Sequence, residues 1–250
     1  MTTLCLRQED IYRGDLMLVN EKYPIKKHTS RGMIQIARES ESILMEARAA
    51  AMYTHLMRDI GNEDEIIPVS AYRSKEEQEA IYRESTERNG EDFTRKYVAL
   101  PERSEHQTGL AVDVGENRGN VDFICPVLPY TGIYGRFRER APRYGFIERY
   151  TKGKEKITGI AHEPWHFRYV GYPHSEIIRD KGFCLEEYTE YVKNYRIGGG
   201  RLIFQHKSRR IEIFYVPSCA GETETEVPGD APYQLSGNNV DGFVVTVWGK

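Results

Sequence analysis

The chain has 250 residues, with 35 Lys and Arg against 38 Asp and Glu and a net charge of −3. This balance provides no basic surface of the kind that binds nucleic acid, and no uninterrupted apolar run is long enough to cross a membrane. The length allows one large or two small domains with a sizeable buried core.

The opening residues and the cysteines favour a reducing compartment. The start, MTTLCLRQEDIYRGD, is acidic from Glu9 onward and lacks an apolar segment of the signal-peptide kind. The cysteines Cys5, Cys125, Cys184 and Cys219 show no CxxC spacing, so we expect free thiols rather than a disulfide framework. We therefore expect a soluble, cytoplasmic protein with neither a membrane nor a nucleic acid as its partner.

The first third of the chain predicts two helices with a strand between them. Apolar residues recur at helical spacing from about Ser40 to Ile60, and Gly61 is a plausible end of that helix. A strand is predicted over 66–72, where a proline favours an edge or a strand start. The segment 74–77, SKEE, fits a capping box that opens a second helix to about Arg88.

A polar connection and a strongly alternating strand follow. The connection, 89–105, has a length that often forms a lid or a binding loop. The segment 110–115, LAVDVG, alternates as a strand does, with three apolar side chains on one face. The other face places Asp113 between Ala111 and Gly115, which leaves room for a bulky group beside the carboxylate.

The rest of the chain predicts more mixed structure and then a β-rich segment. We expect strands over 146–150, 158–161 and 166–170, and helices over 132–140, 175–180 and 185–195. The glycines 198–200 are a linker signal, and strands are expected beyond them over 202–206, 210–216 and 243–248. The pattern predicts an α+β domain over 1–196 and a small β-rich subdomain over 197–250.

The pentapeptide 162–166, HEPWH, supports two interpretations. As a string it fits H-E-x-x-H, in which two histidines one helical turn apart bind zinc and the glutamate acts as base. Pro164 removes a backbone donor and pushes Glu163 toward extended geometry. A zinc site with a different set of ligands is therefore the alternative to the helical interpretation.

A zinc hydrolase needs three protein ligands, an open position for water and a general base. His106 and Asp113 are candidates for two ligands, because Gly109 lets the chain turn between them and Asp113 lies on the small-residue face. His166 is the third candidate, with Glu163 three residues before it. We expect the other histidines to be surface or satisfied core residues: His28, His55, His162, His174 and His206.

Several segments together match a known family signature. Residues 104–113, SEHQTGLAVD, followed by 163–166, EPWH, fit the pattern S-x-H-x-x-G-x-A-x-D … E-x-W-H. Residues 70–78 resemble the element S-x-Y-R-S-x-x-x-Q, and residues 18–20 resemble an N-terminal L-V-N segment. In these features the chain resembles the zinc D-Ala-D-Ala peptidases of the VanY/VanX type, from about residue 16 to 175. The resemblance implies a small antiparallel sheet flanked by helices, a fold shared with hedgehog signalling domains.

The resemblance assigns the chemistry residue by residue. It makes His106, Asp113 and His166 the ligands of one zinc ion. Glu163 becomes the base that takes a proton from the attacking water and later delivers it to the leaving amine. Arg73 is expected to stabilise the oxyanion on the scissile carbonyl, with a surface charge at the start of a helix as the alternative.

Four further residues are expected near the substrate. The resemblance places Ser104 and Gln78 near the C-terminal carboxylate of the substrate, with a loop hydroxyl and an exposed helix amide as the alternatives. Trp165 either walls the site or packs in the core. Tyr72 either contacts the substrate or is a core or edge residue of its strand.

The implied reaction is zinc-dependent hydrolysis of peptides that end in D-Ala-D-Ala. The resemblance points to the bifunctional VanXY-like type, which removes the terminal D-Ala of peptidoglycan precursors and cleaves the D-Ala-D-Ala dipeptide in glycopeptide resistance. An L,D-carboxypeptidase of the same fold is an alternative, and so is a zinc-containing binding module of the hedgehog kind. A pure binder needs neither Glu163 nor Arg73, which favours the enzyme.

Overall fold

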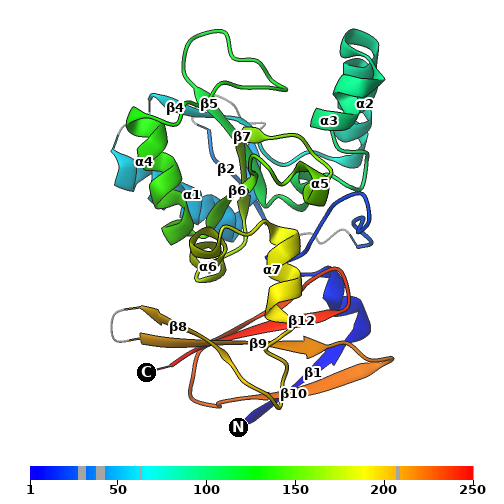
Figure 1. Ribbon diagram of the computed structural model, residues 1–250, viewed down its shortest axis with the longest axis vertical. Helices are drawn as coiled ribbons and strands as arrows, with labels where there is room; N and C mark the ends of the chain where they lie inside the picture. Colours follow the sequence, from blue (N-terminus) through cyan, green and yellow to red (C-terminus); the bar gives the residue numbers. More distant parts are fainter. Residues whose placement is uncertain (28–31, 38–42, 62–63, 207–208, 250) are drawn as a thin grey trace. The chain divides into compact units, whose positions relative to one another are not determined.

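The computed structural model describes residues 1–27, 32–37, 43–61, 64–206 and 209–249, which form two compact units (Figure 1). The larger unit comprises Val19–Pro24 and His28–Cys184, and the β-rich unit comprises Met1–Leu18, Ile25–Lys27 and Leu185–Lys250. This division differs from the expected boundary at residue 197, because the first strand and the last helix of the chain belong to the β-rich unit. The expected α+β class, with an antiparallel sheet flanked by helices, is confirmed.

The larger unit is built on a four-stranded antiparallel sheet in the order β4-β5-β7-β6. Its strands are β4 (Ile66–Ser70), β5 (Ala111–Glu116), β6 (Phe146–Tyr150) and β7 (Glu163–Tyr169). Asp113 lies directly across from His166, and Ala111 lies across from Arg168. Since residues opposite each other in a sheet point the same way, these four side chains share one face.

The other face of this sheet carries the core of the unit. Helices α1 (Ala47–Ile60) and α4 (Gly132–Arg140) lie on that side (Figure 1). Val112 of β5 and Phe167 of β7 are buried there, and the ring of Phe137 meets that of Phe167 edge-on with centroids 4.8 Å apart. The alternation predicted for this strand is thus confirmed.

Two helices lie beside the sheet face opposite the core (Figure 1). Helix α2 (Lys75–Asn89) opens with the predicted capping box, in which Ser74 Oγ accepts the Glu77 N–H at 3.1 Å. Helix α3 (Glu91–Tyr97) lies within the polar connection 89–105, where no helix was predicted. Thr94 is the buried residue of this helix, and its hydroxyl lies 2.9 Å from that of Ser85.

Two further segments differ from the prediction. Residues 158–161 were expected to be a strand, but the short helix α5 (Glu155–Thr158) ends at Thr158 and residues 159–161 form neither helix nor strand. The helix expected from about Ser40 begins only at Ala47, since strand β3 (Leu44–Glu46) precedes it and pairs with β2 (Met33–Gln35). Residues 40–42 lie outside the described residues. The larger unit also contains the 3-10 helices η2 (Glu105–Thr108) and η3 (Ala141–Tyr144), and helix α6 (His174–Lys181).

The β-rich unit contains a four-stranded sheet in the order β11-β12-β9-β8 and a two-stranded sheet of β1 and β10. Its elements are β1 (Thr2–Arg7), η1 (Gln8–Tyr12), α7 (Leu185–Val192), β8 (Leu202–His206), β9 (Arg209–Pro217), β10 (Glu222–Val227), β11 (Tyr233–Gly237) and β12 (Gly242–Trp248). The three strands predicted beyond the glycines are confirmed, whereas β1, β10 and β11 were not predicted. In the part of the chain that the structure describes, no helix is both long and apolar enough to cross a membrane.

The turn that leads into β5 generates a prediction about stability. Gly109 has a left-handed φ of 73°, and a Cβ there would lie 2.8 Å from the side chain of Met33 and 3.2 Å from the nitrogen of Glu46. Gly61 has a similar φ of 71°, but a Cβ there would meet nothing within 4 Å. Gly61→Ala should therefore lower the free energy of unfolding by the backbone strain alone, about 1–2 kcal/mol.

We expect Gly109→Ala to cost about 1–3 kcal/mol more than this control, because the added methyl crowds its neighbours. Urea denaturation of the two variants and the parent measures the difference. Equal losses in both variants would show that the close approach at Gly109 contributes nothing.

Candidate metal centre

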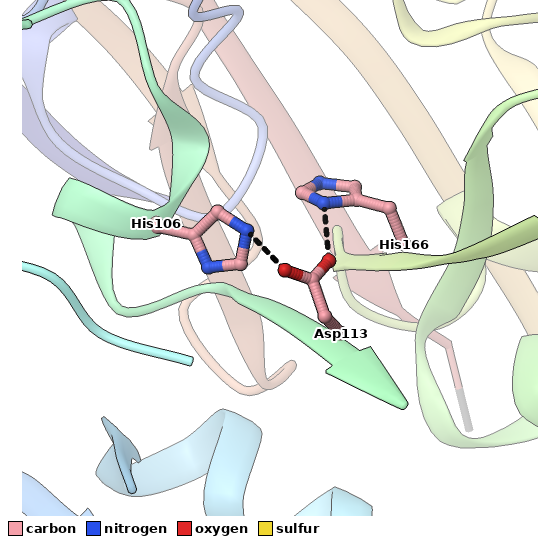
Figure 2. A group of neighbouring side chains, drawn as sticks. All are labelled: His106, Asp113 and His166. Atoms are coloured by element: carbon pink, nitrogen blue, oxygen red, sulfur yellow. Dashed lines mark hydrogen bonds and ion pairs between the residues drawn. The ribbon is translucent and has the colours of Figure 1, made fainter. Parts of the chain in front are cut away.

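Three buried side chains from separate elements converge in the larger unit (Figure 2). His106 comes from η2, Asp113 from β5 and His166 from β7, and each is at most 4% exposed. Their ligand atoms all lie within 4.8 Å of one another. Asp113 is the central residue, since its Oδ2 lies 3.1 Å from His106 Nε2 and its Oδ1 lies 2.9 Å from His166 Nδ1.

The remaining nitrogen of each histidine has its own partner. His106 Nδ1 lies 2.6 Å from the carbonyl oxygen of Ala71, which can only accept a hydrogen bond. Nδ1 therefore carries the proton, and Nε2 is left to bind a cation. His166 is turned the other way, because its Nε2 lies 3.4 Å from Oε2 of Glu105 and its Nδ1 faces Asp113. The two rings thus present different nitrogens to the same point.

These donors fit a zinc ion. Two imidazoles and a carboxylate leave a fourth position for water, as catalytic zinc sites require. Zinc–ligand bonds of about 2.0–2.2 Å place tetrahedral donor atoms roughly 3.3–3.6 Å apart, slightly more than the 3.1 and 2.9 Å measured at Asp113. Burial lowers the pKa of His106 to about 4, with Arg73 adding to the effect, so this ring is in the neutral form that binds metal. Burial alone would also lower the pKa of His166, but Asp113 and Glu105 raise it to about 9, so zinc binding displaces a proton from this ring.

Glu163 lies next to the three ligands as the first residue of β7. Its Oε2 is 3.9 Å from His166 Nδ1, and its side chain is buried. Burial raises the pKa of Glu163 to about 8, although His166 opposes the shift, and a cation bound nearby would lower it. A carboxyl group in this position can both take up and release a proton near neutral pH.

The guanidinium of Arg73 is fixed at the edge of the same cluster. Its Nη2 donates to Asp113 Oδ2 at 2.8 Å, and its Nε donates to Ser70 Oγ at 2.8 Å. Nη1 faces Gln78 Oε1 at 3.4 Å, while Gln78 Nε2 donates to the carbonyl of Ala99 at 2.8 Å. Arg73 is therefore not a surface charge, and Gln78 is a buried amide rather than an exposed one.

A cleft of about 490 Å³, counting its open mouth, lies beside the cluster. Ser104 and Trp165 help to line it, and Trp165 also belongs to the hydrophobic core, so both interpretations of this tryptophan apply. Tyr72 is not among the described residues that line the cleft, and its N–H donates to the Leu44 carbonyl. Further lining residues, which the motifs did not indicate, are Tyr97, Phe123, Ile124, Tyr150 and Ile160.

His162 lies outside the cluster. Its Nε2 is 2.8 Å from the hydroxyl of Tyr130 and 3.4 Å from Oε1 of Glu148, and Glu148 pairs with Arg138 at 2.6 Å. Strand β7 begins directly after His162 and is extended, so His162 and His166 do not share a helical turn. The helical zinc-protease interpretation of HEPWH is wrong.

The sequence analysis missed a group of charges behind His166. Glu105 is buried next to His106, and its Oε1 accepts hydrogen bonds from Arg149 Nε at 2.8 Å and Arg168 Nη1 at 2.9 Å. Both arginine side chains are 0% exposed. The available signal was an arginine within each of two predicted core strands, since a charge in such a place is rare unless it is paired.

Known proteins resemble the chain in sequence. Residues 42–172, about half of the chain, match the family model VanY, described as D-alanyl-D-alanine carboxypeptidase. VanXYC of Enterococcus gallinarum, a bifunctional D-Ala-D-Ala dipeptidase and D-Ala-D-Ala carboxypeptidase, is 40% identical over 179 residues. That alignment covers 71% of this chain and 94% of VanXYC.

Solved structures resemble it as well. The vancomycin resistance D,D-dipeptidase VanXYg, in complex with a D-Ala-D-Ala phosphinate analogue, matches with a TM-score of 0.97 and 51% identity over 99% of both chains. A variant of the vancomycin resistance D,D-pentapeptidase VanY, in complex with Zn(II), matches with a TM-score of 0.60 and 32% identity. This second match covers 70% of this chain and 98% of the other.

The geometry predicts which substitutions abolish metal binding. Asp113→Asn should weaken zinc binding by more than about a hundredfold, because the loss of a partner behind a ligand alone costs about 10–100-fold. His162→Ala should leave the affinity unchanged, since His162 contacts Tyr130 and Glu148 instead. Competition with a chromophoric chelator measures both. Zinc loss in the His162 variant with retention in the Asp113 variant would contradict the proposed ligand set.

Proposed function

The chain belongs to the VanY family of D-alanyl-D-alanine carboxypeptidases, and from that premise we propose how its buried site hydrolyses a D-Ala-D-Ala bond. The enzyme is a zinc-dependent D,D-carboxypeptidase/dipeptidase of the vancomycin resistance type. The observation that carries the proposal is the meeting of Glu163 and Arg73 with the His-Asp-His group at one cleft.

We assign His106, Asp113 and His166 as the ligands of one zinc ion. When bound, zinc supplies Lewis acidity that polarises the scissile carbonyl and activates a water molecule. Glu163 accepts one proton from the attacking water and transfers it to the nitrogen of the leaving D-Ala as the amide bond breaks. Its raised pKa suits both transfers.

Arg73 provides positive charge where the carbonyl oxygen becomes negative. Its side chain is held in place before substrate binds by Ser70, Gln78 and Asp113. A preorganised cation of this kind stabilises an oxyanion without further reorganisation.

Substrate recognition involves the remaining walls of the cleft. Ser104 lies there with its side chain buried, and we assign it to the C-terminal carboxylate of the substrate. Gln78 lines the same cleft and orients the guanidinium of Arg73. Trp165 forms one wall of the cleft.

We further propose that the larger unit is the peptidase domain and that the enzyme works in the cytoplasm. All the residues assigned to the reaction lie within that unit. The four cysteines are free thiols in the structure, as is usual in a reducing compartment. Both activities of the bifunctional type are proposed for this enzyme, because the bifunctional VanXYC is 40% identical to it over 71% of the chain. The likeness to the D,D-dipeptidase VanXYg over 99% of the chain supports the dipeptidase activity.

Replacement of the general base tests the mechanism. In assays of alanine release from D-Ala-D-Ala and from a muramyl pentapeptide, Glu163→Gln should lower kcat by about 10²–10⁴-fold with zinc content unchanged. Glu148→Gln is the matched control, since it removes a partly buried carboxylate of the same sheet outside the cleft.

The same assays separate the alternatives. Undiminished alanine release by the Glu163→Gln variant would contradict the mechanism. Release by the parent only from a tetrapeptide with an L,D bond would indicate an L,D-carboxypeptidase. An absence of release from every peptide, with zinc bound, would indicate a binding module.

Replacement of Arg73 tests the oxyanion assignment. We expect Arg73→Lys to lower kcat by about 10²–10³-fold, because an ammonium group cannot reproduce the planar fork that contacts Ser70, Gln78 and Asp113 together. Arg95→Lys, on the exposed side of α3, is the control. Because Arg73 contacts a ligand, zinc content is measured in parallel, and a fall in kcat matched by zinc loss would contradict the assignment.

A further inference from the structure

Behind the metal centre lies a buried ionic group made of Glu105, Arg149 and Arg168. Oε1 of Glu105 accepts from both guanidinium groups at 2.8 and 2.9 Å. None of the three side chains is exposed to solvent. Such a group stabilises the fold little by itself, because the cost of desolvating the charges offsets their attraction. Its position beside His166 instead indicates a role in the adjacent site.

The group is directed toward one metal ligand. The second oxygen of Glu105, Oε2, lies 3.4 Å from His166 Nε2. The opposite nitrogen of the same ring, Nδ1, lies 2.9 Å from Oδ1 of Asp113. Arg168 is two residues from His166 on β7 and points to the same face. The His166 ring is thus held between the ionic group and the ligand cluster.

We propose that Glu105 is a positioning residue that fixes which nitrogen of His166 binds zinc. This inference rests on the zinc site of the proposed function. Arg149 and Arg168 engage one carboxylate oxygen and so aim the other at the ring. That oxygen accepts a hydrogen bond from Nε2–H, which keeps the proton on Nε2 and leaves the lone pair of Nδ1 directed at the metal. A carboxylate behind a histidine ligand also makes the imidazole a stronger donor.

The arginines make the identity of residue 105 critical. In Glu105→Gln, the two guanidinium groups would still select an oxygen, because they can only donate. The amide NH₂ would then face His166 Nε2 and require that nitrogen to accept. The proton would move to Nδ1, where it competes directly with zinc. The substitution has almost the same shape, yet it favours the wrong tautomer.

Zinc affinity tests this proposal. By chelator competition we expect Glu105→Gln to bind zinc about 10–100-fold more weakly than the parent. Glu148→Gln is the matched control, because Glu148 also lies between an arginine, Arg138, and a histidine, His162, at the same 3.4 Å, but outside the metal centre. Its zinc affinity should equal that of the parent. Urea denaturation of the metal-free variants shows whether both are folded.

The outcomes distinguish this proposal from the zinc site itself. An unchanged zinc affinity in Glu105→Gln, alongside a large loss in Asp113→Asn, would overturn the positioning role and leave the zinc site standing. Equal affinities of the parent and Asp113→Asn would overturn both.

A second measurement needs no substitution at Glu105. Long-range ¹H–¹⁵N spectra of the zinc-loaded parent, labelled at histidine, report which ring nitrogens carry protons. We expect His166 to bind zinc through Nδ1 with its proton on Nε2, and His106 to bind through Nε2. Coordination of His166 through Nε2, or loss of the Nε2 proton, would overturn the proposal even if the variant did not fold.

Discussion

The antiparallel register between β5 and β7 is the constraint on which the active site depends. It sets Asp113 directly across from His166. These two ligands therefore project from the same face of the sheet, on neighbouring strands. It also turns Val112 and Phe167 toward the core. Because side chains alternate along a strand, a slip of one residue would exchange the two faces and destroy both. Core packing therefore holds the metal ligands in place.

The charges around the cleft are buried in a nearly balanced set. Three carboxylates, on Glu105, Asp113 and Glu163, lie close to three arginines. An isolated buried ion costs several kcal/mol, so each carboxylate lies against a cation or a histidine. Asp113 contacts Arg73 and both histidines, and Glu105 contacts Arg149 and Arg168. Among the described residues, the Glu163 carboxylate has only a distant cationic partner, His166 at 3.9 Å. Burial therefore outweighs the attraction of nearby positive charge and raises the pKa of Glu163.

Local sequence patterns indicated the three metal-ligand candidates more directly than the extent of the two compact units. The strand with Asp113 on its small-residue face was readable from local alternation, and Pro164 argued correctly against a helix. Glu105 was not readable in this way, because its importance depends on Arg149 and Arg168, which are distant in the chain. Helix α3 was missed because it lacks an apolar stripe. The extent of the β-rich unit was missed because β1 pairs with β10, and no local pattern records such a pairing.

That pairing has a consequence for the order in which the protein is made. Leu4 is synthesised early, yet its partner Thr225 follows 221 residues later. At about 5–20 residues per second, the N-terminal strand waits roughly 10–45 s on the ribosome for its neighbour. The continuous stretch that forms most of the larger unit emerges within that interval. The larger unit can therefore fold first, while the backbone groups of the opening strand stay unpaired until β10 has been made.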